Sequence, residues 1–258
     1  MIHLFPANGI SDIAYTELIK FLSPHSVTSF TYPPLNDREL QLPTPLNWNY
    51  FDQGIDKQFT SLTNGIGIGH SLGGTLLLNN ALKNPSRWKT IFIVEPALFS
   101  KWINMTYKFV RFLKLEDFTH PMIRVTKPRR EFFDSKETTF KRWRNRHVFS
   151  FLSDASLKYY IDASLIECDK GYQLRFPKNW ECEIYRNMCS LDPFIWENLP
   201  NLKSNLIVIG GESSNTFFES ARRRLKKQSV DFIAIPNTSH LLPFETPLAL
   251  SRIILKHL

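Results

Sequence analysis

The sequence predicts an α/β fold in which a mostly parallel sheet of about six strands is flanked by helices. Short apolar runs, typical of buried strands, alternate with longer segments of helical pattern at both ends of the chain. One glycine-rich stretch, Gly69–Gly74, joins such a run directly to a helical segment. The middle of the chain breaks the alternation and is rich in aromatic residues. These three observations indicate a sheet domain interrupted by a large insertion.

The alternation can be followed in order from the first residue. The sequence predicts strands at 2–6, 27–32, 65–70 and 89–95, and helices at 11–22, 51–63 and 72–83. After the insertion it predicts strands at 205–210 and 230–235, and helices at 216–227 and 245–257. Strands separated by helices usually lie parallel, with helices covering both faces of the sheet.

The stretch Gly69–Gly74 has a serine, Ser71, at the centre of a G-x-S-x-G pattern. In a strand–turn–helix context this spacing is that of a nucleophile elbow. The turn strains the central residue and brings neighbouring chain close, which is why Gly69 and Gly73 carry no side chain. The hydroxyl would lie at a helix N-terminus, where amide donors favour developing negative charge. Ser71 is therefore the candidate nucleophile.

A serine hydroxyl needs a base to take its proton, and His240 is the best placed of the seven histidines. It lies in the loop 237–247, after the predicted strand at 230–235 and before the last helix. In this architecture the histidine comes last along the chain. His70 is next to Ser71, but consecutive residues across a tight turn point apart, so it is expected to be a packed supporting residue.

The third candidate is a carboxylate that orients the imidazole and stabilises the imidazolium. Glu95 ends the predicted strand at 89–95, where burying an unpartnered carboxylate would cost several kcal/mol, so that it needs a partner. Glu212 follows Gly210 and Gly211 at the end of a later strand. We favour Glu95 as the acid and keep Glu212 as the alternative.

The developing oxyanion requires two backbone donors. One is expected to be the amide of Leu72, the residue after the nucleophile. The other should come from the loop after the first strand, where Gly9 allows a bend and the amide of Ile10 is the predicted donor.

These pieces together resemble the α/β-hydrolase superfamily, in particular lid-bearing serine esterases and related enzymes that hydrolyse carbon–carbon bonds of ring-fission products. The resemblance rests on Ala7-Asn8-Gly9, Gly69-His70-Ser71-Leu72-Gly73-Gly74, Val94-Glu95-Pro96, Gly210-Gly211-Glu212, and Ser239-His240 followed by Pro243 and Glu245. Serine at the elbow excludes the dehalogenase and epoxide-hydrolase branches, which the resemblance would give an aspartate there.

The sequence departs from the superfamily pattern in two places. The aspartate usual about three residues after the glycine of the penultimate strand is absent, which favours Glu95, since some members place the acid after the strand that follows the elbow. The chain also begins almost directly with the strand before the oxyanion loop. The two antiparallel strands that usually precede it are therefore missing, which predicts a truncated sheet edge.

The predicted core comprises residues 1–97 and 191–258, and residues 98–190 form a predicted, mainly helical lid. Many aromatic residues of this lid are expected to face the cleft and build an apolar acyl or aryl pocket. Glu181, Glu183 and Tyr185 are further residues that could reach it.

Composition limits the partners. The formal net charge is +8, and we interpret the basic clusters as solvated helix faces rather than a nucleic-acid surface, with an anionic membrane surface as another alternative. Cys168, Cys182 and Cys189 lack zinc spacing and are expected to be free thiols. We expect no metal and no cofactor, no transmembrane segment, no signal peptide and a cytoplasmic location. The sequence leaves open whether the protein forms a homodimer.

The sequence therefore predicts a serine hydrolase that cleaves a carboxylic ester of a small or medium acyl group through an acyl-enzyme. Hydrolysis of a carbon–carbon bond in a ring-fission-type diketone is an alternative, because the same three side chains would serve it. A non-catalytic ligand-binding member of the fold is the alternative from another class.

Overall fold

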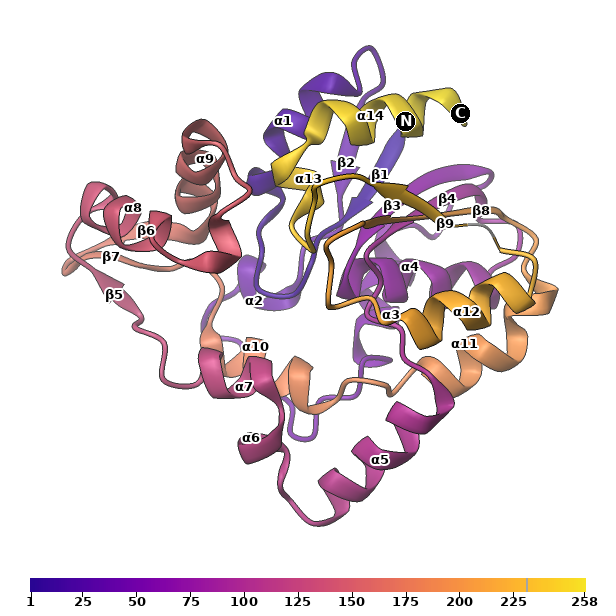
Figure 1. The fold of residues 1–258 in the computed structure, drawn as a ribbon, viewed down its shortest axis with the longest axis horizontal. Helices are drawn as coiled ribbons and strands as arrows, with labels where there is room; N and C mark the ends of the chain where they lie inside the picture. Colours follow the sequence, from indigo (N-terminus) through magenta and orange to yellow (C-terminus); the bar gives the residue numbers. More distant parts are fainter. Residues whose placement is uncertain (231) are drawn as a thin grey trace.

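The computed structural model describes residues 1–230 and 232–258 and confirms the predicted α/β architecture (Figure 1). Asp231, within the strand predicted at 230–235, lies outside the described residues. Six strands form one sheet in the order β2-β1-β3-β4-β8-β9, and every neighbouring pair is parallel. Their bounds are β1 (Ile2–Phe5), β2 (Val27–Ser29), β3 (Gly65–His70), β4 (Trp88–Val94), β8 (Asn205–Gly211) and β9 (Phe232–Ile235).

Helices cover both faces of this sheet because the buried strands are apolar on both sides. In β4, Phe92 and Val94 belong to one core cluster, whereas Ile91 and Ile93 belong to the other. The first cluster includes residues of η1 (Asp12–Tyr15), α1 (Thr16–Phe21) and α14 (Pro247–Lys256). The second includes residues of α3 (Tyr50–Gln58), α4 (Leu72–Lys83) and α12 (Glu219–Lys227). Figure 1 shows these two sets of helices on opposite sides of the strands.

Two predicted elements differ from the observed ones near the first strands. The helix predicted at 11–22 is divided into η1, which Ser11 caps by accepting the amide of Ile13, and α1. The strand predicted at 27–32 ends at Ser29, and the prolines after it begin a short helix, α2 (Pro33–Asn36). Proline suits the first turn of a helix, which explains why α2 begins at Pro33.

The chain between β4 and β8 adds no strand to the main sheet. Its helices are α5 (Lys101–Phe112), α6 (Glu116–Thr119), α7 (Pro121–Thr126), α8 (Lys136–Arg144), η2 (His147–Phe149), α9 (Asp154–Ser164), α10 (Lys178–Arg186), α11 (Asp192–Asn198) and η3 (Leu199–Asn201). It also forms an antiparallel sheet in the order β5-β7-β6, from β5 (Phe132–Phe133), β6 (Leu165–Cys168) and β7 (Gly171–Leu174).

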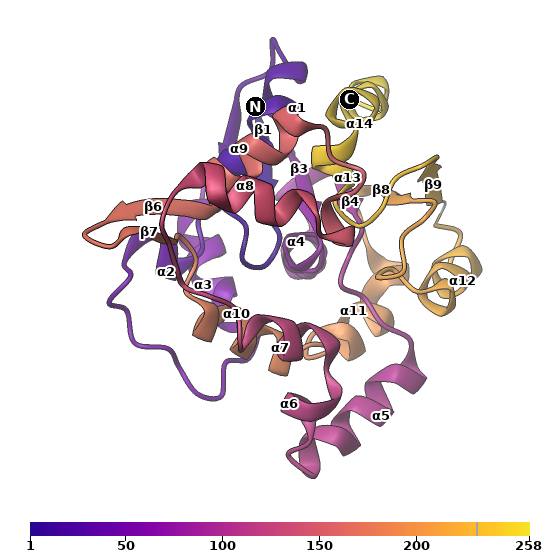
Figure 2. The same cartoon turned by 60° about the vertical axis from the view of Figure 1, so that its left-hand side comes forward.

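This small sheet was not predicted, because its strands are too short to show a clear alternation. Figures 1 and 2 both show it beside α8 and α9 at one side of the molecule, whereas α5 and α6 extend from the lower edge. The division into a core of 1–97 and 191–258 and an insertion of 98–190 stays a prediction.

Cys168, Cys182 and Cys189 are free thiols, and Cys182 and Cys189 are buried. Within residues 1–230 and 232–258, no helix combines the length and the apolar character needed to cross a membrane.

Candidate active site

Ser71 lies between the last residue of β3 and the first residue of α4, with φ 53° and ψ −118°. A non-glycine residue rarely adopts a positive φ, so the surrounding chain must hold it there. The constraint is visible at the flanking glycines. A Cβ added to Gly73 would lie 2.1 Å from the carbonyl oxygen of Phe5, and one added to Gly69 would lie 2.6 Å from the Cα of Gly74. The close approach of α4 to β1 and β3 therefore depends on glycine.

The elbow is also tied to the turn after β4. The amide of Ser71 donates to the carbonyl of Val94 at 2.9 Å, and the amide of Ala97 donates to the carbonyl of Ser71 at 3.3 Å. The hydroxyl of Thr75, one turn into α4, donates to the carbonyl of Ala97 at 2.9 Å. These bonds place the candidate nucleophile next to the segment that carries Glu95.

Glu95 follows β4 directly, is fully buried and has a φ of 50°. Its Oε1 accepts the amide of Gly211 at 2.7 Å, and its Oε2 accepts the hydroxyl of Ser214 at 2.5 Å. Gly210 leaves room for the carboxylate, since an added Cβ there would lie 2.6 Å from Oε1. The carboxylate is therefore held by donors from the last residue of β8 and from the loop after it. Ser214 lies three residues after Gly211, where the superfamily pattern places an aspartate.

His240 approaches this carboxylate from the loop after β9, with its Nδ1 3.1 Å from Oε2 of Glu95. A carboxylate oxygen accepts, so Nδ1 donates and Nε2 stays available to accept a proton. About a quarter of the His240 side chain is exposed, at 24%. Glu212 is exposed, and its amide donates to Ile235. The structure thus brings Glu95, and not Glu212, to the imidazole.

His70 supports the loop that carries His240. Its Nε2 lies 2.9 Å from the carbonyl oxygen of His240, and the two rings are 5.1 Å apart between centroids. The residue is fully buried in the core, and burial, together with the nearby His240 ring, holds the pKa of His70 well below its usual value. A neutral ring that donates from Nε2 must accept at Nδ1. The expectation that His70 is a packed supporting residue fits this geometry.

The acceptor Nδ1 of His70 is paired with a tyrosine that sequence analysis did not identify. The hydroxyl of Tyr15 donates to Nδ1 at 2.7 Å and accepts the amide of Ala7 at 3.0 Å. Burial raises the pKa of Tyr15 well above its usual value, so the hydroxyl keeps its proton. One chain of hydrogen bonds therefore joins the loop after β1, the elbow and the loop of His240. Tyr15 belongs to no sequence motif, and only its position in the helix predicted at 11–22 could have indicated it.

The loop after β1 does not present the amide of Ile10 as predicted. That amide donates to the carbonyl of Ala7 at 3.2 Å and closes a turn over residues 7–10. The turn forms because Gly9 takes a φ of 75°. The amide of Leu72, in contrast, belongs to the first residue of α4 and has no acceptor within the helix. Within the described residues, the amide of Asn8 donates to no protein acceptor.

The insertion touches this loop through Glu181. The carbonyl of Glu181 accepts the side-chain amide of Asn8 at 3.1 Å, and its carboxyl carbon lies 2.8 Å from the Cβ position of Gly9. The carboxylate is almost fully buried, is paired with Arg129 and accepts the hydroxyl of Thr126 at 3.2 Å. Although burial opposes it, this pairing raises the pKa of Arg129 above its ordinary value. An ion pair between a buried carboxylate and a partly exposed guanidinium thus packs against the loop after β1.

Within the described part of the chain, no group of three or more histidine, cysteine or acidic side chains is arranged to hold a metal ion.

The sequence matches the model of the alpha/beta hydrolase family over residues 17–253. Since this range covers most of the chain, the protein belongs to that family. Residues 1–16, which contain β1 and the loop after it, lie outside the match. No curated protein sequence matches the chain significantly.

Solved structures resemble this fold at low sequence identity. The peroxisomal alpha-beta-hydrolase Lpx1 from Saccharomyces cerevisiae has a TM-score of 0.76 and 19% identity, over 99% of this chain and 75% of that one. The esterase Rv0045c from M. tuberculosis has a TM-score of 0.74 and 14% identity, over 99% and 84%. The enol-lactonase from Burkholderia xenovorans LB400 has a TM-score of 0.62 and 13% identity, over 99% and 89%. At these identities the likeness establishes the fold.

Proposed function

We propose that this protein is a serine hydrolase that cleaves a carboxylic ester of a small or medium acyl group through an acyl-enzyme. The observation that carries the proposal is the 3.1 Å contact between Nδ1 of His240 and Oε2 of Glu95. This contact gives the imidazole the tautomer of a general base. Membership of the hydrolase family and the esterase among the similar structures support the same assignment.

In the first half-reaction, Oγ of Ser71 attacks the ester carbonyl while Nε2 of His240 takes the hydroxyl proton. Glu95 stabilises the imidazolium, which then gives its proton to the leaving alcohol as the carbon–oxygen bond breaks. The amide of Leu72 holds the developing oxyanion. In place of Ile10, we propose the amide of Asn8 as the second donor. One such donor is typically worth about 10²–10³ in rate.

In the second half-reaction, water attacks the acyl-enzyme and His240 takes a proton from it. The tetrahedral intermediate collapses, the carboxylic acid leaves, and the proton returns to Ser71.

The test is hydrolysis of p-nitrophenyl acetate and butyrate, combined with labelling by a fluorophosphonate. Ser71→Ala should lower kcat by about 10³-fold or more and abolish labelling. Ser150, which is exposed and outside the site, provides the matched control Ser150→Ala, and this variant should behave as the unsubstituted protein does.

Equal rates for Ser71→Ala and the unsubstituted protein would refute the role of Ser71. Labelling of Ser71 without turnover of any ester in a chain-length series would refute the ester assignment and favour another carbonyl substrate. Absence of both labelling and turnover would favour a ligand-binding member of the fold.

A further inference from the structure

Helix α5 exposes large apolar side chains on its outer side, although polar side chains are among those that it buries. On most helices of a folded domain the apolar face points inward. On α5 the buried residues include Asn104, whose amide donates to Asp192 at 3.1 Å, and Tyr107, whose hydroxyl donates to the carbonyl of Tyr185 at 3.2 Å. The outward face instead carries aromatic side chains, with Trp102 exposed by 72% and Phe112 by 80%.

The outward residues Trp102, Met105, Phe109 and Phe112 are spaced by three or four positions, so they lie along one side of the helix. All four are more than half exposed. We call this stripe the α5 apolar face. Figures 1 and 2 show α5 extending away from the main sheet, with no other element covering its outer side. The expectation that the aromatic residues of the insertion face the cleft is wrong for these side chains.

The same segment carries most of the net positive charge of the protein. Residues 101–130 contain eight lysine or arginine residues and two acidic residues, whereas the whole chain has 32 and 24. Lys101 and Lys108 are exposed and border the α5 apolar face. Phe118, in α6, is 74% exposed, and Val125, in α7, is 62% exposed.

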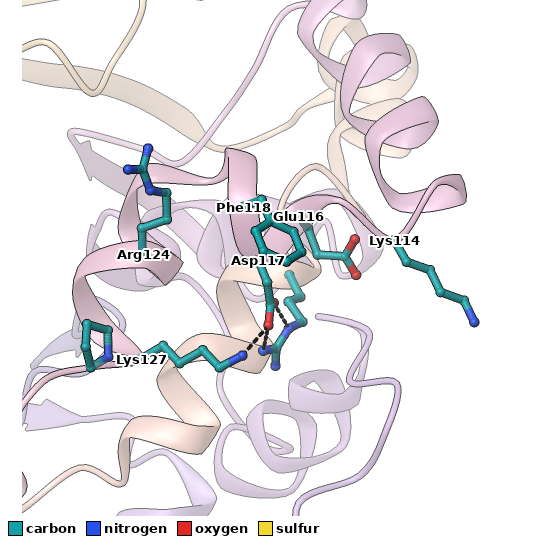
Figure 3. Close-up of a pocket in the computed structure, with 8 residues that line it drawn as sticks. Lys114, Glu116, Asp117, Phe118, Arg124 and Lys127 are labelled. Carbon is teal, nitrogen blue, oxygen red and sulfur yellow. Dashed lines mark hydrogen bonds and ion pairs between the residues drawn. The ribbon is translucent and has the colours of Figure 1, made fainter.

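A basic depression lies close to α5, between α6, α7 and α10. This open cavity of about 650 Å³ is lined by four cationic and two acidic residues. Figure 3 shows the side chains that line it. Asp117 pairs with Lys127 at 2.7 Å and with Arg186 at 2.7 Å. Lys114 and Arg124 extend away from this cluster, and within the described residues neither forms an ion pair. The depression therefore keeps two unneutralised cations beside exposed apolar groups.

We propose that the α5 apolar face and this depression dock on the surface of a membrane that contains anionic lipids. Aromatic side chains on one helix face with bases beside them are the pattern of helices that lie in the membrane interface. The aromatic rings enter the boundary between headgroups and acyl chains, and the bases attract lipid phosphates. A second copy of the chain fits less well, since a two-fold contact would bring Lys101 and Lys108 of both copies together.

The fluorescence of Trp102 can serve as an intrinsic probe of membrane docking. Of its six tryptophans, Trp48, Trp88, Trp143, Trp180 and Trp196 are buried, and Trp102 alone is exposed. Mixing the protein with vesicles of 70% phosphatidylcholine and 30% phosphatidylglycerol should shift the tryptophan emission to the blue. Lipids brominated on the acyl chains should quench it. Pure phosphatidylcholine vesicles should bind at least ten-fold less, and binding to the anionic vesicles should fall as salt rises from 50 to 500 mM.

Co-sedimentation with the same vesicles tests the residues. Phe109→Asp combined with Phe112→Asp should reduce the bound fraction at least ten-fold. The matched control is Leu248→Asp combined with Leu255→Asp, at exposed positions of α14, and it should bind unchanged. Far-UV circular dichroism of both variants checks that they fold. Ser71→Ala should bind as the unsubstituted protein does, which separates this proposal from the proposed hydrolase activity.

Equal vesicle binding by the Phe109/Phe112 variant and the unsubstituted protein would overturn the proposal, as would the absence of binding to anionic vesicles. Sedimentation velocity supplies a further criterion. A dimer in the absence of lipid that is broken by the Phe109/Phe112 substitutions, and no binding to vesicles, would assign the face to a second copy instead.

Discussion

Nε2 of His70 donates a hydrogen bond to the backbone carbonyl oxygen of His240 at 2.9 Å. The residue that precedes the candidate nucleophile therefore holds the loop that carries the candidate base. Because Nδ1 of the same ring accepts from Tyr15, which in turn accepts from Ala7, three loops at the carboxyl edge of the sheet share one chain of bonds. Ala7, Tyr15 and His70 are buried, so a bond lost among them leaves a partner without water to replace it.

Tyr15→Phe removes the central hydroxyl of this chain and leaves the amide of Ala7 and Nδ1 of His70 unpaired. The free energy of unfolding should fall by about 1–3 kcal/mol. If Tyr15 positions the site, kcat for p-nitrophenyl acetate should also fall by about 10-fold to 100-fold with KM unchanged, since small misplacements of reacting groups cost rate. Steady-state kinetics and urea unfolding check both. Tyr159→Phe, at an exposed position, is the control, and a loss of stability alone would make Tyr15 merely structural.

A comparison of Glu95→Gln with Glu212→Gln tests which of the two candidate carboxylates orients His240. Glutamine has one acceptor oxygen, which cannot accept from both the amide of Gly211 and Nδ1 of His240. The side chain also carries no charge, so the imidazolium loses its stabilising partner. The expected loss in kcat is about 10²–10⁴-fold. Glu212→Gln, at an exposed position without contact to the imidazole, should leave kcat within about two-fold. Comparable losses in the two variants would reject the assignment of Glu95.

Gly73→Ala tests how α4 is packed against β1. The added methyl group would lie 2.1 Å from the carbonyl oxygen of Phe5, and neither backbone can move away freely. We expect a loss of several kcal/mol or failure to fold. Gly54→Ala, in α3, is the matched control, because its Cβ would meet Phe30 at an ordinary 3.5 Å. Alanine should there stabilise the helix by roughly 0.5–1 kcal/mol, measured by urea unfolding. A neutral Gly73→Ala would contradict the close approach.

The buried carboxyl group of Asp192 should make the stability of the protein depend on pH. Its side chain accepts the amide of Phe99 at 3.0 Å, and burial raises its pKa from 3.8 to about 7. A carboxyl whose pKa is raised by folding contributes stability that is present below the unfolded pKa and is lost as pH rises through the folded one. The unsubstituted protein should therefore lose stability relative to Asp192→Asn between about pH 4 and pH 7, by roughly 1 kcal/mol per pH unit.

Urea unfolding of both proteins at pH 4.5, 5.5, 6.5 and 7.5 measures this difference. Comparison with the asparagine variant removes the contribution of the other titrating groups. A free-energy difference between the two proteins that stays constant over this range would show that Asp192 is not the group responsible.

The sequence predicted the main sheet well because its signals are local. The strand at 65–70 and the helix at 72–83 have the predicted bounds, since glycine packing and apolar periodicity both define them. The preference for Glu95 over Glu212 came from the cost of burying a carboxylate at the end of an apolar strand, and the structure places Glu95 beside His240.

The remaining features depend on contacts between distant segments, which no local pattern reveals. Ile10 was a plausible donor until the turn over residues 7–10 engaged its amide. The bond between Tyr15 and His70 joins residues 55 positions apart. The outward face of α5 could not be assigned either, because an amphipathic pattern gives the two faces of a helix without saying which one meets the core.

One consequence follows from Glu95 ending β4 instead of an acid ending β8. Ser71 and Glu95 directly follow the neighbouring strands β3 and β4, which the single crossover helix α4 connects. Both therefore belong to one β–α–β module, whereas His240 comes from the loop after β9. Because the two residues lie in one short stretch of sequence, they can be transferred together to another protein scaffold. An engineer moving this chemistry to another doubly covered scaffold could graft the nucleophile and the acid as one contiguous unit. The imidazole, the second oxyanion donor and the donors that hold the carboxylate would then come from the new scaffold.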